Sequence, residues 1–239
     1  MIPTIITSSK GRLEHLKQSI ESWLAFTPCK IVVVDYDCPD GTHSWVLREL
    51  SGSRRVDTIA LKPGEHTFNK GRALNAGVRQ CMNRFAFFFD ADTRVTADFW
   101  PWIQVRLAPG FDHKMFLAEP SAEAVDLTGV LGIRLDHFAA VGGYDESMLG
   151  WGSEDLDLRL RLFVAWKPET VFMPAGLFSP IAHDDALRTR FYDEKDKLQS
   201  HQRNLQRLVN KLEASTGVGI ADHLKDPLIQ SLFSCARKP

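Results

Sequence analysis

The sequence predicts an α/β fold built on a mainly parallel sheet that is flanked by helices. Strand-like and helix-like segments alternate over the first hundred residues or so, which is the pattern of a parallel sheet with right-handed crossovers. Two strand-like runs, K-I-V-V-V-D at 30–35 and F-A-F-F-F-D at 85–90, have only apolar residues at 31–34 and 85–89, as expected for strands buried on both faces. Each run ends in an aspartate, and ligands of such sheets bind outside the carboxyl ends of the strands.

The other elements are predicted from apolar periodicity and from turn residues. Before residue 85 we expect strands at 3–7 and 56–61, and helices at about 12–25, 43–51 and from residue 71 onward. After residue 95, where Trp100-Pro101-Trp102 interrupts the periodicity, we expect antiparallel or edge strands at 114–119 and 128–133, a short helix at 134–141 and a last strand at 170–174. One more helix should start at an N-cap, Ser153, and end near 165, and a long polar helix should span 186–214.

Composition places the chain among ordinary globular proteins. It has 239 residues, of which 44% are hydrophobic and 25% charged, and a formal net charge of −1, which does not indicate nucleic acid as a partner. No apolar run reaches the roughly 18 residues needed to span a bilayer, although peripheral membrane contact stays compatible with the sequence. The N-terminus does not resemble a signal peptide. The four cysteines lack metal-ligand spacing, so we expect free thiols and a cytoplasmic protein.

Asp90 and Asp92 follow the most apolar strand of the chain. In extended backbone, side chains two residues apart point the same way, so the two carboxylates should repel each other unless a cation or a proton lies between them. Oxygen ligands favour a hard divalent ion, which makes Mg²⁺ or Mn²⁺ the first expectation. The alternative is that the two aspartates only begin a loop and cap the next element of the chain.

Two further clusters of charged residues fall at predicted helix starts. Lys70, Arg72 and Asn75 lie near the start of the third helix, where a helix N-terminus and two cations could bind an anion. Glu154 and Asp155 open the helix after Ser153, and there they could serve chemistry or only interact with the helix dipole.

At this point the residues resemble a known family. F-F-F-D-A-D at 87–92 is similar to the DxD motif of nucleotide-sugar glycosyltransferases of the GT-A fold. The stretch from Gly129 to Arg161, with G-G-Y-D-E at 142–146 and G-W-G-S-E-D-L-D at 150–157, resembles the β-1,4-galactosyltransferases, the polypeptide N-acetylgalactosaminyltransferases and the chondroitin polymerase domains. The resemblance covers roughly residues 3–185. Leu156 departs from it, because the galactosyltransferases usually carry another acid there.

The resemblance implies a metal-dependent, inverting transferase that moves a hexose or N-acetylhexosamine from a UDP-sugar to a saccharide hydroxyl, with Mn²⁺ or Mg²⁺ as cofactor. It implies a GT-A domain at 1–185, with a nucleotide-binding half at 1–95 and an acceptor half at 96–185, followed by a helical extension at 186–239. The residues that the resemblance singles out for the nucleotide are Thr7, Arg12, Asp35, Lys70, Arg72, Asn75 and Asp90. Those for the acceptor are Trp151, Gly152 and Glu154.

The resemblance also assigns the catalytic and metal-binding roles. An inverting displacement needs a base for the acceptor hydroxyl, and that base is expected at Asp155, with Glu154 beside it on the acceptor. Asp90 and Asp92 would hold the metal. Because two carboxylates leave a six-coordinate ion short of ligands, His183 is expected as a third, which would favour Mn²⁺ over Mg²⁺. The alternatives stay open: His183 as a surface histidine that caps a helix, and Trp151 as a core residue.

Two other classes of function compete with this prediction. A haloacid dehalogenase-like phosphatase also ends an apolar strand in Asp-x-Asp, and Asp184-Asp185 could supply its downstream acids. That motif normally opens its fold, however, whereas three strands and three helices precede it here. A non-catalytic module that binds a sugar nucleotide is the other alternative, and the presence of every expected acid argues against it.

Overall fold

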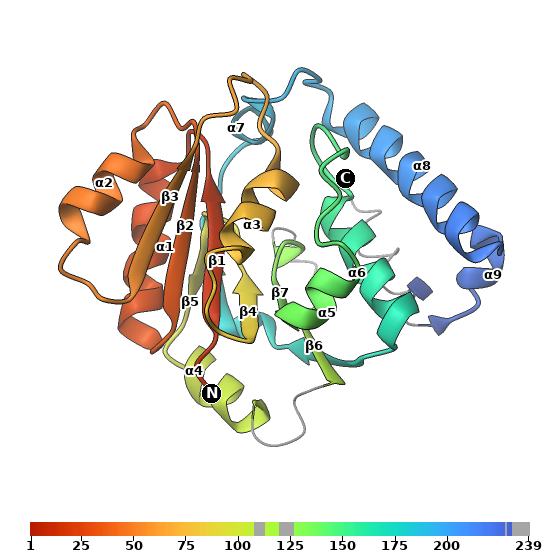
Figure 1. The fold of residues 1–239 in the computed structure, drawn as a ribbon, viewed down its shortest axis with the longest axis horizontal. Helices are drawn as coiled ribbons and strands as arrows, with labels where there is room; N and C mark the ends of the chain where they lie inside the picture. Colours follow the sequence, from red (N-terminus) through yellow and green to blue (C-terminus); the bar gives the residue numbers. More distant parts are fainter. Residues whose placement is uncertain (108–112, 120–126, 228, 231–239) are drawn as a thin grey trace.

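A seven-stranded sheet with helices on both sides forms the centre of the computed structural model, which describes residues 1–107, 113–119, 127–227 and 229–230 (Figure 1). The strands of this sheet are β1 (Thr4–Ser9), β2 (Lys30–Tyr36), β3 (Val56–Leu61), β4 (Phe85–Phe88), β6 (Lys114–Ala118), β7 (Leu131–Arg134) and β8 (Glu169–Met173). The order is β3-β2-β1-β4-β7-β6-β8. The first four strands are parallel, and β7 is antiparallel to both β4 and β6. The mainly parallel α/β sheet predicted from the sequence is confirmed.

Alternating side chains on the strands divide the core into two layers. Phe85, Phe87 and Phe89 belong to the cluster on one face, together with residues of α1 (Leu13–Phe26), α2 (Thr42–Glu49) and α4 (Phe99–Arg106). Ala86 and Phe88 belong to the cluster on the other face, which α3 (Lys70–Val78), α5 (Leu135–Ala140), α6 (Glu154–Trp166) and α8 (Lys197–Thr216) cover. A strand buried on both faces, as predicted for residues 85–89, is what this arrangement requires.

Several short elements were not predicted from the sequence. A two-stranded sheet pairs β5 (Thr93–Val95) with β9 (Phe178–Pro180), just after the turn η3 (Ala175–Leu177), and a short helix, α9 (Ile220–His223), follows α8. The segment around Trp100-Pro101-Trp102, where the apolar periodicity is interrupted, forms a helix that was not predicted, and Pro101 lies in the first turn of this helix, α4. A proline is tolerated there, since its missing N–H would have no partner inside the helix.

The long helix predicted at 186–214 is two helices in the structure. α7 (Asp185–Thr189) ends early, and α8 starts at Lys197. Between them, Phe191 packs against Gly11 and its carbonyl accepts a hydrogen bond of 2.7 Å from the Phe68 amide, while Tyr192 is buried beside the Phe68 ring. Tertiary burial of these two aromatic side chains therefore outweighs the helical periodicity.

The described residues also bear on two predictions made from composition. None of the helices found in them is long and apolar enough to cross a membrane. Cys29 and Cys38 are buried and Cys81 is half-buried, and all three are free thiols, as expected. Cys235 lies outside the described residues.

Candidate active site

The carboxyl end of β4 brings Asp90 and Asp92 to the edge of the sheet, but their carboxylates have different partners. Lys70 Nζ lies 2.9 Å from Asp90 Oδ1. Asp92 Oδ2 lies 2.6 Å from His183 Nε2 and accepts a hydrogen bond of 3.2 Å from the Arg12 guanidinium. Burial raises the pKa of Asp90 despite the nearby Lys70, whereas His183 and Arg12 outweigh burial and lower the pKa of Asp92. Each carboxylate is thus paired with cationic or basic groups from distant parts of the chain.

Lys70 joins the two acid clusters that lie far apart in the sequence. Its ammonium is 2.9 Å from Asp90, 2.9 Å from Asp155 Oδ2 and 3.5 Å from Glu154 Oε1. The residue stands at the start of α3, where the Asn69 side chain caps the helix by accepting from the Arg72 amide. Burial acts to lower the pKa of Lys70, but the surrounding carboxylates outweigh it and raise that pKa well above its usual value.

Asp155 and Glu154 differ in their environments although they are neighbours at the start of α6. Asp155 Oδ1 accepts a hydrogen bond of 3.1 Å from the hydroxyl of Tyr144, which is itself 2% exposed. Glu154 Oε2 is buried and has no hydrogen-bond partner in the part of the chain that the structure describes. Burial and the adjacent Asp155 raise the pKa of Glu154 to about 7, against the opposing effect of Lys70. A carboxyl group of this kind can donate a hydrogen bond to a hydroxyl near neutral pH.

The loop before these acids is held in an unusual backbone conformation. Gly150 and Gly152 have φ values of +88° and +90°, which glycine adopts readily, and Ser153 has φ of +72°. Ser153 is the N-cap residue of α6, as predicted, but its hydroxyl lies 3.0 Å from His201 Nδ1 and makes no capping bond to the helix. The Trp151 ring is half-buried, with Lys197 Nζ 4.6 Å from its centroid.

The predicted nucleotide residues Thr7 and Asp35 lie on neighbouring parallel strands. Thr7 is fully buried on β1, and its hydroxyl has no hydrogen-bond partner within the described residues. Asp35 is 5% exposed on β2, and its two oxygens accept from the backbone amides of Cys38 and His43, each at 2.7 Å. The contacts of Asp35 therefore hold the turn into α2.

Arg72 and Asn75 lie on the exposed side of α3 and contact the segment before the acid-rich helix. The Arg72 side chain is 37% exposed and pairs with Glu65 and Glu146. Asn75 donates hydrogen bonds to the Tyr144 carbonyl and to Glu146, and accepts one from the Tyr144 amide. Asn75 thereby fixes the turn that carries Tyr144 toward Asp155.

Tyr144, Gly129 and Tyr192 are the site residues that the sequence did not single out. Tyr144 belongs to the motif at 142–146, but its role follows only from the structure, where its buried hydroxyl donates a hydrogen bond to Asp155. A Cβ at Gly129 would lie 2.0 Å from Asp90 Oδ2, so only glycine permits this approach. Tyr192 is 6% exposed, and burial together with the nearby Glu154 raises its pKa. No periodicity or spacing marks these three positions.

As the side chains stand, the described residues contain no group of three or more His, Cys, Asp and Glu side chains arranged to hold a metal ion. Asp92 and His183 form a pair, with their facing atoms 2.6 Å apart. The cations of Lys70 and Arg12 neutralise Asp90 and Asp92 in this state.

Two family models match the two halves of this arrangement. The model of glycosyl transferase family 2 matches residues 4–107, which include the aspartates after β4. The model described as the N-terminal domain of galactosyltransferase matches residues 118–176, which include Glu154 and Asp155. A comparison with curated protein sequences gave no match.

Solved structures with the same fold cover most of the chain. A mannosyltransferase from Pyrobaculum calidifontis, in complex with GDP-Man and Mn²⁺, has a TM-score of 0.63 at 13% identity over 99% of this chain and 86% of its own. S. aureus TarS in complex with UDP-GlcNAc has a TM-score of 0.64 at 11% identity over 94% and 75% of the two chains. Drosophila β1,4-galactosyltransferase 7, in complex with manganese, UDP-Gal and xylobiose, has a TM-score of 0.55 at 14% identity over 84% and 79%.

The fold and the two family matches define the chain as a glycosyltransferase. It has the GT-A fold, which the solved structures share.

Proposed function

We propose that the chain is a metal-dependent, inverting transferase that moves a hexose or N-acetylhexosamine from a UDP-sugar to a saccharide hydroxyl. The observation that carries the proposal is the Lys70 bridge. A single buried ammonium contacts Asp90 from the family 2 match and both Glu154 and Asp155 from the galactosyltransferase match. Acids more than sixty residues apart in sequence therefore share one site, as a reaction between a donor and an acceptor requires.

The side chains of Asp90, Asp92 and His183 are suitable ligands for a divalent ion. Asp92 Oδ2 and His183 Nε2 face each other at 2.6 Å, so a small separation of these side chains would let both ligate one ion, with Asp90 close by. Such an ion would supply positive charge for the leaving diphosphate. A carboxylate-imidazole set favours Mn²⁺, and the Pyrobaculum and Drosophila structures were solved with that metal.

The chain's own residues supply the remaining chemistry. Asp155 would take the proton of the acceptor hydroxyl as that oxygen bonds to the anomeric carbon, while the bond from that carbon to the diphosphate breaks and the nucleotide leaves with the electron pair. Tyr144 orients the Asp155 carboxylate through its 3.1 Å hydrogen bond. Glu154, with its pKa raised to about 7 by burial and Asp155, would hold an acceptor hydroxyl, and Trp151 and Gly152 would line the acceptor side.

The nucleotide would lie at the carboxyl ends of β1, β2 and β4, where Thr7, Asp35 and Asp90 stand. Lys70 and Arg12 lie beside Asp90 and Asp92, so both cations would be available to the diphosphate where a divalent ion compensated the two carboxylates. We keep residues 1–185 as the catalytic domain, with donor and acceptor halves that meet near residue 95, and residues 186–239 as its extension.

The contacts of Asp184 and Asp185 argue against the phosphatase alternative, which needs these two acids in its active site. Asp184 caps α7 by accepting from the Leu187 amide, and Asp185 pairs with Lys197 at 2.9 Å. Both residues are exposed and already engaged in these local contacts.

A thermal-shift panel tests the proposal directly. UDP should raise the melting temperature of the protein with Mn²⁺ or Mg²⁺ but not in EDTA, because a divalent ion held by Asp90, Asp92 and His183 would supply the positive charge that the diphosphate needs. GDP, CDP and dTDP serve as competitors for the nucleotide assignment. Asp92→Asn should abolish the shift and keep the fold, whereas Asp57→Asn, at an exposed position of β3, is the matched control and should keep the shift. Equal stabilisation by UDP in EDTA would contradict metal dependence.

A further inference from the structure

Helix α8 runs along the loop formed by residues 145–153, which we call the acceptor loop and which leads directly into Glu154 and Asp155 (Figure 1). We propose that α8 is a positioning element of the active site: it holds the acceptor loop so that these two acids stand where the transfer needs them. This inference rests on the proposed transferase function, and it assigns a role to the chain beyond residue 185.

The first half of α8 bonds three successive residues of the acceptor loop, two of them at backbone atoms and the third at its side-chain hydroxyl. Ser200 Oγ accepts from the Trp151 amide at 2.8 Å, and Asn204 Nδ2 donates to the Gly152 carbonyl at 2.9 Å. Both helix residues are completely buried. The Ser153 hydroxyl lies 3.0 Å from His201 Nδ1, so the residue just before Glu154 is also tied to the helix.

These bonds support a backbone that would not hold its shape alone. Ser153 adopts φ of +72°, a left-handed conformation that costs a residue with a Cβ about 1–3 kcal/mol. Gly150 is packed so closely that a Cβ there would lie 2.4 Å from Ser200 Oγ. The helix and the loop are therefore fitted to each other, and moving either one would move the start of α6.

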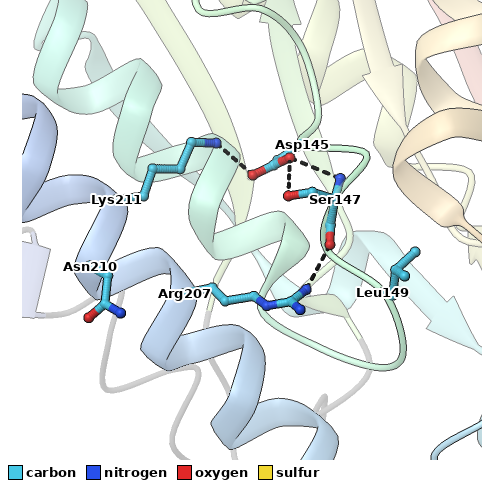
Figure 2. Close-up of a pocket in the computed structure, with 6 residues that line it drawn as sticks. All are labelled: Asp145, Ser147, Leu149, Arg207, Asn210 and Lys211. Atoms are coloured by element: carbon cyan, nitrogen blue, oxygen red, sulfur yellow. Dashed lines mark hydrogen bonds and ion pairs between the residues drawn. The ribbon is translucent and has the colours of Figure 1, made fainter.

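The second half of α8 holds the earlier part of the loop with a row of basic side chains. Figure 2 shows Arg207 donating to the Ser147 carbonyl at 2.8 Å and Lys211 reaching Asp145 Oδ2 at 2.6 Å. Arg203, one turn earlier, donates to the Leu149 carbonyl at 3.2 Å. Because the three residues are four apart, they lie on one face of the helix. An open cleft of about 660 Å³ lies beside Arg207 and Lys211.

Helix α8 makes two kinds of contact: apolar packing against the core and hydrogen bonds to the acceptor loop. Leu208 belongs to the core cluster on this face of the sheet and Leu212 is also buried, so apolar packing contributes to holding the helix. Four of its hydrogen bonds run instead to backbone atoms of the loop that precedes the catalytic pair, and two more contacts reach the side chains of Asp145 and Ser153. A displacement of about 1 Å at a reacting group can lower a rate by about two orders of magnitude, so such bonds matter for catalysis even when they add little stability.

The test compares two buried positions with two matched controls on the same helix. Ser200→Ala and Asn204→Ala remove the bonds to the loop. Ser215→Ala removes a hydroxyl that bonds only within α8, and Asn210→Ala changes an exposed asparagine. Hydrogen–deuterium exchange is followed in peptides that cover residues 145–155. Hydrolysis of UDP-GlcNAc and UDP-Gal with Mn²⁺ gives kcat and donor KM, and titration gives the UDP affinity.

The expected result is faster exchange in the acceptor loop of Ser200→Ala and Asn204→Ala, by about tenfold at the Trp151 amide. Their kcat should fall about tenfold, with donor KM and UDP affinity within twofold of the unsubstituted protein, and both controls should match that protein in every measurement. Unchanged loop exchange would overturn the inference, and so would faster exchange with unchanged kcat. If the unsubstituted protein neither binds UDP with Mn²⁺ nor hydrolyses a UDP-sugar, the proposed function fails instead, and the exchange data still decide whether α8 holds the loop.

Discussion

Replacing Lys70 by methionine should reveal how much the buried acid cluster depends on one cation. In the folded protein Lys70 touches Asp90, Glu154 and Asp155, and its side chain is 13% exposed. Methionine has a similar length and no charge, so the change removes the ammonium and leaves little empty space. The three carboxylates would then share the site without a compensating charge.

The magnitude comes from the cost of leaving buried charges unpaired, which is about 3–5 kcal/mol in the free energy of unfolding. For a chain of this size that corresponds to a fall in melting temperature of roughly 6–20 °C. The effect should depend on pH. The folded pKa of Glu154, raised to about 7 by burial and Asp155, lies above its ordinary value, so its contribution to stability is largest below about 4.5 and falls as pH rises through 7. Without Lys70 that pKa rises further, and the loss grows toward pH 8.

Denaturant unfolding at pH 5 and pH 8 measures this dependence. We expect Lys70→Met to lower the free energy of unfolding by about 3–5 kcal/mol at pH 8 and by less at pH 5, where Glu154, with its pKa raised to about 7 by burial and Asp155, is largely protonated. Lys17→Met is the matched control, because Lys17 forms an exposed pair with Glu14 and should contribute less than about 1 kcal/mol at either pH. An equal loss at both values of pH, or a loss at pH 8 no larger than that of the control, would refute the reasoning.

Two further substitutions test the roles proposed for single residues. Asp155→Asn should lower the kcat of UDP-sugar hydrolysis by about 10²–10⁴-fold, the usual contribution of a positioned base, with the UDP affinity unchanged; near-normal turnover would leave Asp155 as an acid that serves only the helix start. His183→Ala should weaken Mn²⁺ affinity by at least about tenfold in a calorimetric titration and narrow the difference between Mn²⁺ and Mg²⁺, because a nitrogen ligand is lost. Unchanged affinity and preference would show that His183 contacts Asp92 without binding metal.

The fold was predictable because its main strands carry strong local signals. The runs at 30–35 and 85–90 are too apolar for any position except the middle of a sheet, and the helices between them show clear periodicity. The short strands β5 and β9 carry three residues each and pair only with one another, so nothing local marks them. Phe191 fits the periodicity of a helix, but the structure uses it to cover Gly11, and a contact between positions so far apart cannot be inferred from spacing.

The acidic residues of the candidate site could be predicted from the sequence, but the contacts between them and the other side chains of the site could not. Asp90 and Asp92 stand out as two carboxylates directly after a very apolar strand, and Glu154 and Asp155 stand out because they follow the Gly-Trp-Gly motif at 150–152. That Lys70 would bridge them, that Tyr144 would reach Asp155, and that Gly129 would make room for Asp90 all depend on the packing of separate elements. Sequence spacing does not contain this information.

The position of β4 within the sheet affects how the chain folds while it is being synthesised. Its neighbours are β1 on one side, already synthesised when Phe88 leaves the ribosome, and β7 on the other, which is translated only later. Until Leu131–Arg134 arrives, a strand rich in phenylalanine has an open edge whose amides and carbonyls could pair with another chain. A fragment that stops before β7 keeps this edge exposed, and such edges promote aggregation during folding. Recombinant pieces of the protein should therefore extend past Arg134, and slowed translation between β4 and β7 should increase the demand for chaperones.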